Sequence, residues 1–525
     1  MTTVTPYRSG LRAGRDGFGR LLLAEWTKFR TVRGWVIGMT LSALVVLGLG
    51  LLSAAGSHMS CSKGPVEVPC PALPTGPGGE AVNDRLYLVH QSLTGDGGIT
   101  ARLTSLTGQI RLPDANPGVR RVVAGLVPWA KAGLMVKEST AQGSPYAAVM
   151  LTGAHGVRMQ HDFTEDVAGR PGGVSATAPR WLRLTRSGDT LTGYESPDGR
   201  RWTEVGSARL PGLPATVRIG LFATSPGDLR VTQDVLGGAI AASRFTEATG
   251  VFDQVSLRGG GARGAWSRDD IGVTTELDGT PHHPGRLVES GGRFAVTGVG
   301  DVGPAGAEYA QPVERTLSGA LTGLIVVIVV AVGFVAAEYR RGLIHTTLLA
   351  SPRRGRVLVA KALVIGTVTF ATGLAAVAVT VPVCLSILRA NGNQILPVSW
   401  FTELRVIVGT AALLAATAVL ALALGALFRR GAVAVITAIA VIVLPYILAT
   451  TSVLPLGVAQ WLLRVTPAAG FAIQQSVPEY PQVLSHYAPQ MGYFPLPPWA
   501  GLAVLCAYAA LALGLAVVRL RRRDA

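Results

Sequence analysis

Long runs of apolar residues occupy the two ends of this 525-residue chain and leave its middle polar. A helix needs about 20 apolar residues to span the hydrocarbon core of a membrane, and six runs reach that length. None of them holds a charged residue or a histidine between its flanks, apart from Arg405 at the edge of the fourth. The pattern predicts six membrane-spanning helices, over residues 34–54, 317–337, 362–388, 405–427, 431–453 and 499–518.

Three of these runs have an alternative interpretation. The first could be a secretory signal, but more than 30 residues precede it and it exceeds the roughly 7–15 apolar residues of such signals. An uncleaved anchor is therefore favoured. The fourth and fifth runs could form one kinked segment, but about 50 residues is too long for a single span. Arg429 and Arg430 between them instead predict a tight turn.

The polar middle of the chain shows short β-branched or aromatic stretches separated by turn residues. RWLRLTR (180–186), TLTGYES (190–196) and RWTEVGS (201–207) are joined by Ser-Gly-Asp and Pro-Asp-Gly-Arg. Such spacing is typical of strands joined by hairpin turns. We therefore predict an all-β sandwich inserted between the first and second helices.

Two basic segments beside the apolar runs have patterns of their own. In residues 18–35, Phe18, Leu22, Trp26 and Phe29 recur at three- and four-residue steps, which predicts an amphipathic helix at the membrane surface. Residues 338–361 are too long for a simple turn, and the proline at 352 breaks any helix there. A solvated loop is the simpler interpretation, but the apolar positions of this segment favour a docking surface for a cytoplasmic partner.

Composition and charge support a membrane protein. Only 15% of the residues are charged, whereas soluble proteins have about 25%. The net charge of +16 would suggest a nucleic-acid partner if it covered one soluble face. Instead, 19 of the 47 Lys and Arg residues lie in short segments beside the apolar runs, with only four acidic residues. This positive-inside pattern predicts a multi-pass plasma-membrane protein with both termini cytoplasmic, and it disfavours nucleic acid.

The predicted fold class is therefore a membrane α-helical protein with an inserted all-β sandwich. Its parts are a cytoplasmic tail with the amphipathic helix (1–33), the first transmembrane helix (34–54), an extracellular domain (55–316) and helices two to six (317–525). The last part includes the cytoplasmic segment 338–361.

Four cysteines are present, two of them just beyond the first apolar run. If that region lies outside the cell, Cys61 and Cys70 can form a disulfide in an oxidising compartment. Two free thiols are the alternative.

Four stretches carry a resemblance to a known family. LLLAEWTKFRT (21–31) and EYRRGLIHTTLLASPRRGRVLVAK (338–361) resemble permease subunits of type-2 ABC exporters (ABC-2), most strongly actinobacterial members. The C-terminal stretches WLLRVTPAAGFAIQQSVP (461–478) and PPWAGLAVLCAYAALALGLAVVRLRRRDA (497–525) are similar to the same permeases. The departure from the family pattern is the large insertion between the first two helices, which many members lack.

The resemblance implies a fold and a set of partners. Six helices would form half of a pathway, two such chains would pair as a homodimer or with a related permease, and a separate P-loop ATPase would bind and hydrolyse ATP. The chain itself has no G-x-x-x-x-G-K-[ST] motif, so we expect that it does not hydrolyse ATP by the P-loop route. We also expect no cofactor, metal or catalytic site in this chain. The resemblance places these residues at the ATPase interface: Glu25, Trp26, Lys28, Glu338, Tyr339, Arg340, Arg341, Thr346, Thr347, Arg353 and Arg354.

A second resemblance concerns the polar middle. The order AKAGLMVKES, PRWLRLTRSGDTLTGYESPDGRRWTEVG, VRIGLFATS resembles concanavalin-like and laminin-G-like sandwiches, which often bind carbohydrate. Trp129, Trp181 and Trp202 are candidate platforms for an extracellular glycan, although tryptophans in such strands are more often largely buried. No catalytic constellation is evident in this region.

Two functions are compatible with these observations. The first is the membrane subunit of an ATP-driven exporter. The alternative is an anchored sensor or cell-wall-binding protein whose sandwich does the work, for which six helices would be more than an anchor requires. A proton- or ion-coupled transporter is disfavoured because the predicted spans lack ionisable groups. The transported molecule is not predicted.

Overall fold

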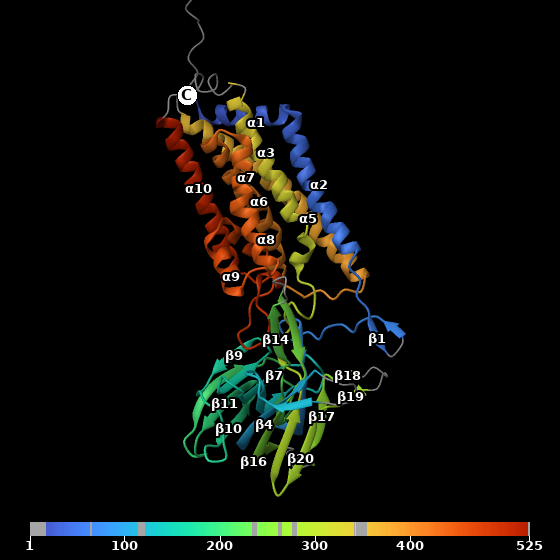
Figure 1. Ribbon diagram of the computed structural model, residues 1–525. Helices are drawn as coiled ribbons and strands as arrows, with labels where there is room; N and C mark the ends of the chain where they lie inside the picture. Colours follow the sequence, from blue (N-terminus) through green and yellow to red (C-terminus); the bar gives the residue numbers. More distant parts are fainter. Residues whose placement is uncertain are drawn as a thin grey trace, which may run out of the picture.

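The molecule has two parts, a bundle of long helices and a β-rich domain at one end of it (Figure 1). The bundle is made from both ends of the chain, and the domain comes from the segment between them. The two-part prediction of apolar helices and a β-rich domain is confirmed. This computed structural model describes residues 17–63, 66–113, 121–233, 239–260, 265–275, 281–340, 342 and 354–522.

Six helices among the described residues are long and apolar enough to cross a membrane. Each overlaps one of the predicted apolar runs. They are α2 (Arg33–Ala55), α3 (Ala320–Arg340), α5 (Arg354–Ala390), α6 (Trp400–Phe428), the α7–α8 helix (Gly431–Thr450) and α10 (Pro498–Arg522).

The fifth of these helices is irregular. It consists of α7 (Gly431–Ala438), a π-helical turn over Ile439–Val443 and α8 (Leu444–Thr450). Pro445, near the start of α8, supplies no backbone N–H and so removes one of the regular helical hydrogen bonds there. A bent pair follows, in which α9 (Leu456–Val465) and the 3₁₀ helix η3 (Pro467–Gln474) meet at 100°. This pair is either a broken span or a re-entrant loop.

Small residues allow the helices to approach closely. At Gly425 of α6, an added Cβ would lie 2.6 Å from Val335 of α3. On the other side of α3, the Ser42 hydroxyl of α2 donates a hydrogen bond of 2.9 Å to the Gly323 carbonyl. Close backbone contact and interhelical hydrogen bonds of this kind hold helices together where hydrophobic burial gives little driving force.

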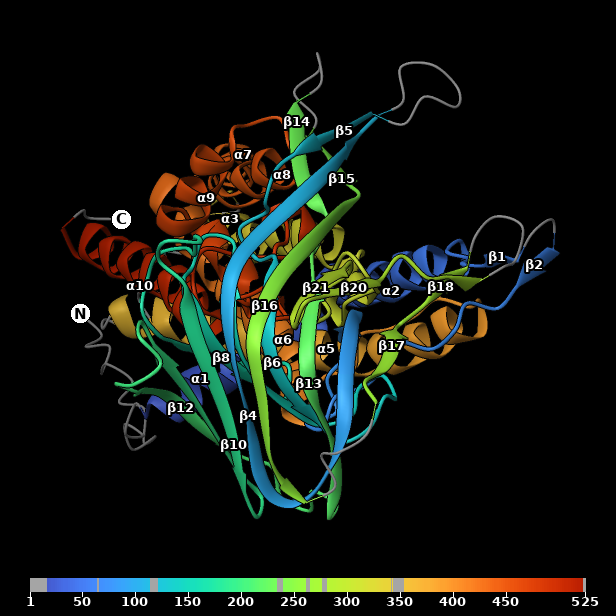
Figure 2. The same cartoon turned by 90° about the horizontal axis from the view of Figure 1, so that it is seen from below.

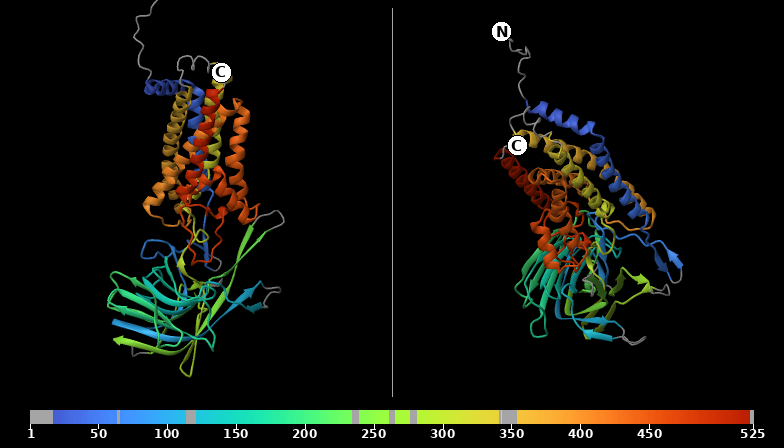
Figure 3. Two further views of the ribbon diagram at one scale, coloured as in Figure 1. Left: turned by 90° about the vertical axis from the view of Figure 1, so that its left-hand side faces the viewer. Right: turned by 45° about the horizontal axis from the view of Figure 1, so that its top comes forward.

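The amphipathic helix α1 (Phe18–Thr31) lies across the end of the bundle that is farthest from the β-domain (Figures 1 and 3). It ends at Val32, which has an extended backbone, and α2 begins at the next residue. Phe29 is buried against the bundle, whereas Leu23 is exposed. The predicted amphipathic pattern of residues 18–35 therefore corresponds to a helix with one face on the bundle.

The β-domain is a sandwich in which one 27-residue strand, β4 (Leu86–Leu112), takes part in both layers. Figure 2 shows β4 and β16 running side by side along the length of the domain. The first layer has the order β17 (Ser267–Ile271), β4, β13 (Thr216–Thr224), β6 (Lys131–Lys137), β7 (Tyr146–Thr152), β8 (Val157–His161) and β9 (Glu165–Ala168). The second layer has the order β12 (Thr203–Arg209), β11 (Thr190–Ser196), β10 (Arg180–Ser187), β4, β16 (Thr246–Gly260), β21 (Arg293–Gly298) and β20 (Arg286–Ser290).

All these pairings are antiparallel, and β10, β11 and β12 form the predicted meander. Leu134 and Val149 of the first layer pack with Leu182 and Leu191 of the second in one apolar core. The smaller elements are β1 (Cys61–Lys63), β2 (Val66–Val68), β3 (Val82–Asp84), β5 (Arg121–Ala124), β14 (Asp228–Gln233), β15 (Ala239–Arg244), β18 (Thr274–Thr275), β19 (Pro281–His282), β22 (Val302–Pro304), η1 (Val313–Leu317) and η4 (Pro489–Met491). A disulfide joins Cys61 and Cys70 beside β1 and β2.

The first layer is buried on its second face as well. Leu88, Met135 and Phe222 point away from the sandwich core and pack against Val82 and Val302, in the segments that enter and leave the domain. Two buried ion pairs fix these segments to the sheet. Lys137 contacts Asp84 at 2.7 Å, and Lys131 contacts Asp301 at 2.7 Å.

The loop before α10 joins the domain to the bundle. The Gln482 side-chain amide donates to the Thr164 carbonyl at 2.7 Å, and the Ala307 N–H donates to the Tyr493 hydroxyl at 3.2 Å. Val483 is buried at the same place. The domain is thus held by two chain connections and by this third, non-local contact.

Candidate functional site

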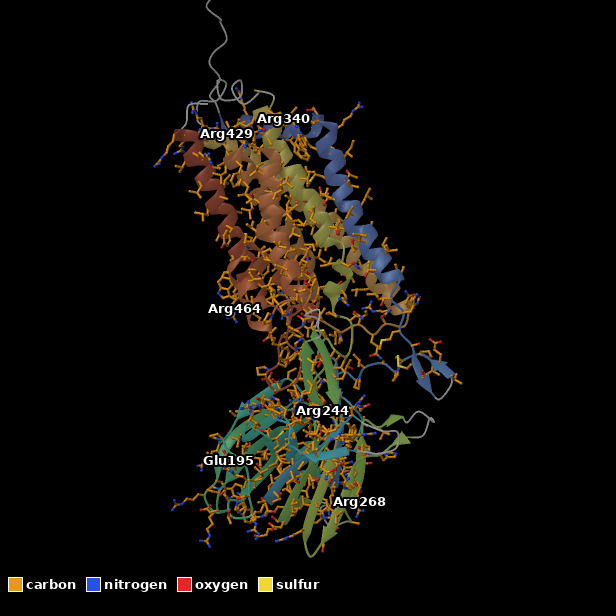
Figure 4. The ribbon with its side chains drawn as sticks, in the orientation of Figure 1. Glu195, Arg244, Arg268, Arg340, Arg429 and Arg464 are labelled. Atoms are coloured by element: carbon orange, nitrogen blue, oxygen red, sulfur yellow. A yellow bond between two sulfur atoms is a disulfide. The ribbon has the colours of Figure 1, made fainter. Side chains whose placement is uncertain are left out.

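Basic side chains gather at the end of the bundle opposite the β-domain, which we call the basic end. Figure 4 shows Arg340 and Arg429 there, at the ends of α3 and α6, and Arg464 at the other end. Helix α1 and the first turns of α5 lie at the same level as the two former arginines (Figure 1). The basic end also holds acidic groups, and these are buried.

A charge network lies inside the basic end, where α1, α3 and α5 meet. The Lys361 ammonium of α5 donates to Glu25 of α1 and to Glu338 of α3, each at 2.6 Å. Glu25 is 0% exposed, Lys361 1% and Glu338 8%. Burial of a charge is costly unless it is paired and hydrogen-bonded, and each of these groups meets that condition.

A second ammonium closes the network. Lys28 donates to Glu25 at 2.9 Å and to Glu338 at 3.2 Å, while 41% of its side chain remains exposed. Burial lowers the pKa of Lys28, but the hydrogen bond and charge of Glu25, together with those of Glu338, outweigh it and leave the pKa raised. Two carboxylates and two ammonium groups therefore form a neutral cluster. We call Glu25, Lys28, Glu338 and Lys361 together the charge network.

Local sequence places these groups. Glu25 and Lys28 are three residues apart on α1, so they share a face with Phe29 one residue later. Phe29 packs edge-on against Phe334 of α3, with ring centroids 5.8 Å apart. Phe334 lies one turn before Glu338, and the Lys361 ammonium lies 4.9 Å from its ring centroid. The contact between Phe29 and Phe334 thus packs directly against the ion pairs.

The arrangement is suited to transmitting movement rather than to chemistry. It ties α1 to the last turn of α3 and to the early turns of α5, which flank residues 343–353. Both flanks therefore share buried ion pairs with α1. Within the described part of the chain, no group of three or more His, Cys, Asp or Glu residues could hold a metal ion.

The predicted interface residues divide into three sets. Glu25, Lys28 and Glu338 are brought together in the charge network. Trp26 is exposed on α1, and Arg340 is exposed at the end of α3. In the third set, the Tyr339 ring centroid lies 5.3 Å from the Arg429 guanidinium, and Arg354 donates a hydrogen bond to the Leu520 carbonyl. The other members of this set lie outside the described residues: Arg341, Thr346, Thr347 and Arg353.

Two of these placements change the sequence-based interpretation. The family resemblance places Glu25 and Glu338 on a partner-facing surface, but their carboxylates point inward because Lys361 and Phe29 lie on the same side. Lys361, which occupies the centre, is not among the predicted interface residues. The sequence does contain a sign of this role. Lys361 stands at the start of an apolar run with no acidic residue close to it in the chain, so a buried lysine there needs an acidic partner from another part of the fold.

A second polar cluster lies at the end of the bundle near the β-domain. Glu314 of η1 accepts hydrogen bonds from the Ser476 N–H, at 3.2 Å, and from the Ser476 hydroxyl. The Arg405 guanidinium donates to the Gln475 carbonyl at 2.7 Å. Arg405 therefore binds a backbone carbonyl just beyond η3. This contact explains why a charged residue stands at the edge of the apolar run 405–427. A pocket of about 490 Å³ adjoins it, lined also by Arg464 and other polar groups.

Glu314 gives this cluster a pH dependence. Burial raises the pKa of Glu314, and the Ser476 hydrogen bonds only partly offset this. Between the ordinary pKa of a glutamate and this raised pKa, the folded protein keeps a proton that the unfolded chain has released. Glu314 therefore contributes most to stability at low pH. That contribution is lost as pH rises through the raised pKa.

We expect Glu314→Gln to remove this slope. Thermal unfolding midpoints measured from pH 4 to pH 8 should fall less with pH in the variant than in the wild-type protein, with similar values at pH 4. Glu308→Gln, an exposed acid near the same loop, is the matched control and should keep the wild-type slope. An unchanged slope in Glu314→Gln would contradict the assignment.

The three candidate tryptophan platforms have protein neighbours on their rings. Trp129 is buried and stacks on His155, with centroids 4.1 Å apart. Trp202 lies 3.8 Å beneath the Arg183 guanidinium, and Arg102 lies 5.9 Å from the Trp181 ring. Glycan binding at these residues stays a prediction.

Comparisons with known proteins bear on much of the β-domain and on the helices that follow it. A family model described as "ABC-2 family transporter protein" matches residues 147–525. No curated protein matches the chain. A functionally unknown protein from Saccharomyces cerevisiae is 13% identical, with 38% of this chain and 85% of that one covered and a TM-score of 0.22. Scytalido-glutamic peptidase with a transition state analog inhibitor is 8% identical, with 41% and 98% covered and a TM-score of 0.24. Neither similarity is close enough to assign a fold or an activity.

Proposed function

This chain belongs to the ABC-2 transporter family, and we propose that it is the membrane-spanning permease subunit of an ATP-driven exporter, coupled to a separate ATPase through its basic end. The single observation that carries the coupling proposal is the charge network. It joins the surface helix α1 to both flanks of residues 343–353, so one partner bound at that end can move three helices together.

The proposed orientation places the basic end in the cytoplasm. Excess Lys and Arg beside membrane helices mark the cytoplasmic side. Large aromatic residues mark the membrane–water interfaces, and Trp400, Phe401, Trp461 and Trp499 are all strongly exposed at the end near the β-domain. On this basis the six long helices are spans, and the β-domain lies outside the cell. The Cys61–Cys70 disulfide is in keeping with an oxidising compartment.

ATP hydrolysis is assigned to a partner. The 525 residues contain no G-x-x-x-x-G-K-[ST] phosphate loop, whose backbone amides and lysine hold the phosphates of ATP. The partner would contact the exposed side chains around the charge network, Trp26, Arg340 and Arg356, and we propose that two copies of the chain complete one pathway.

Co-purification tests the coupling. The tagged full-length chain should retain, in mild detergent, a polypeptide that has the phosphate-loop motif and vanadate-sensitive ATPase activity. The double variant Trp26→Ala/Arg356→Glu should retain at least fivefold less of it, because it changes the exposed contact surface without touching the buried ion pairs. Arg464→Glu, at the opposite end of the bundle, is the matched control and should retain the wild-type amount. Equal retention by the double variant would overturn the proposal.

A further inference from the structure

A groove opens at the basic end, on the side of α3 that faces α2 and α7 rather than the charge network. Its volume is about 740 Å³. Val329, Val332 and Ala336 of α3 form one wall, and Val435 of α7 forms another. Along its length the groove is therefore apolar, and it lies between helices that span the membrane under the proposed function.

The mouth of this groove is strongly basic. Arg340, Arg429 and Arg430 line it, and the described residues that line the groove include no aspartate or glutamate. Arg429 is held in place, since it ends α6 in a left-handed backbone conformation (φ 57°) and its guanidinium lies 5.3 Å from the Tyr339 ring centroid. Guanidinium groups bind phosphate and carboxylate oxygens in pairs, so the mouth is built for an anion.

The backbone adds to this potential. Helix α7 begins at Gly431, directly after Arg430, and no side chain caps its first N–H groups. The amino end of a helix attracts anions through these groups. Gly431 and Ala432 line the groove beside the arginines, so the uncapped amino end and the three guanidinium groups face the same space.

The length of the groove fits a hydrocarbon chain attached to the anionic group. Val329, which is 51% exposed, lies eleven residues before Arg340 on α3. At 1.5 Å per residue, this is a distance of about 16 Å along the helix. A hydrocarbon chain of about a dozen carbons could lie there with its head group among the arginines. A protein partner could not reach this depth without inserting into the membrane.

We propose that the groove binds an anionic lipid-like amphiphile from the cytoplasmic leaflet, with its acidic head group at Arg340, Arg429 and Arg430 and its acyl chain between α3 and α7. It is the entry site for the exported molecule, which is therefore an acidic amphiphile. This substrate class rests on the proposed exporter function, whereas the binding itself does not.

Binding is measured with the delipidated, full-length chain by native mass spectrometry, without nucleotide or ATPase. Phosphatidylglycerol should bind at least tenfold more tightly than phosphatidylcholine. The triple variant Arg340→Gln/Arg429→Gln/Arg430→Gln should lose this preference. Arg519→Gln/Arg521→Gln/Arg522→Gln removes the same charge from the same end of the bundle, outside the groove, and should keep it.

Two further measurements separate the sources of the anion. Val329→Trp fills the apolar wall at an exposed position and should weaken phosphatidylglycerol binding severalfold with the arginines intact. Glycerol 3-phosphate, a head group without a chain, should not compete. Competition by glycerol 3-phosphate, or unaltered binding in both groove variants, would overturn the proposal. The proposal would also be overturned if a second copy of the chain occupied the groove of the wild-type protein and the protein showed no preference for phosphatidylglycerol.

The role as an entry site has its own readout. In the complex with its ATPase, phosphatidylglycerol should stimulate ATP hydrolysis severalfold for the wild-type chain and much less for Val329→Trp, which leaves Arg340 and the other proposed ATPase contacts unchanged. Lipid binding without stimulation would overturn the entry role. Since the binding assay contains no ATPase, a wild-type chain that shows no lipid preference but retains the ATPase normally refutes this inference alone. Lipid preference without ATPase retention refutes the exporter function alone.

Discussion

Replacing Lys361 with methionine should destabilise the helical bundle by about 3–5 kcal/mol, the usual cost of removing one partner from a buried ion pair. Lys361 is the only member of the charge network that reaches Glu25 and Glu338 at 2.6 Å each. Without it, two buried carboxylates share a single ammonium, that of Lys28, whose side chain is 41% exposed. Thermal unfolding of the detergent-solubilised protein should show a clearly lower midpoint, and retention of the ATPase should fall with it.

Two companion variants make this result specific. Lys361→Met/Glu25→Gln/Glu338→Gln removes the uncompensated charges along with the lysine and should recover most of the lost stability, while ATPase coupling remains impaired. Arg519→Met removes an exposed cation from the last turn of α10 and should leave the stability within about 0.5 kcal/mol of the wild-type value. If Lys361→Met has the same thermal unfolding midpoint as Arg519→Met, the charge network does not stabilise the contact between α1, α3 and α5.

The second large effect is expected in the β-domain, for Lys131→Met. Lys131 is fully buried on β6, and its ammonium donates to Asp301 at 2.7 Å and to the Val302 carbonyl at 2.6 Å. Residues 301–304 begin the segment that leads from the sandwich to α3. Loss of the lysine leaves Asp301 buried without its cation, at a cost of about 3–5 kcal/mol. Limited proteolysis should then cut this segment at least tenfold faster.

The reciprocal substitution tests the cause. Lys131→Met/Asp301→Asn removes both charges, so proteolysis should slow again towards the wild-type rate. Arg209→Met, at an exposed position on β12, is the control for loss of a single positive charge. Equal cleavage rates in wild-type protein and Lys131→Met would show that the ion pair does not fix this segment.

Local sequence patterns were sufficient for the parts of the fold that depend on nearest neighbours. Apolar runs of span length became long helices, and turn residues such as Gly188 separated strands of the β10–β12 meander. The long β4 shows the limit of this approach. Its Gly-Asp-Gly-Gly stretch at 95–98 has the composition of a turn, yet the strand continues through it. An added Cβ at Gly98 would lie 2.7 Å from the Leu184 carbonyl oxygen, so tertiary packing explains that glycine.

The candidate site required information that a single sequence does not contain. Glu25 and Lys361 are 336 residues apart and meet only because α1 crosses the end of α3 and α5. A periodic pattern shows that Glu25 is on a helix, but it does not show which neighbour supplies the opposite charge. The resemblance to ABC-2 permeases pointed to the two segments that hold Glu25 and Glu338, whereas the burial of their carboxylates depended on the packing of Phe29 against Phe334.

The way the β-domain is attached has a mechanical consequence. Helix α3 runs from the charge network to η1 without interruption, over 21 residues or about 31 Å, and the domain at its far end is fixed by buried ion pairs and by the loop before α10. Under the proposed function, α3 and the attached domain would act together as the long arm of a lever. In the proposed orientation, a small tilt of α3 imposed at the basic end would become a swing of the whole sandwich on the opposite side of the membrane. If the basic end binds an ATPase as proposed, the position of the β-domain would follow the nucleotide state of that partner.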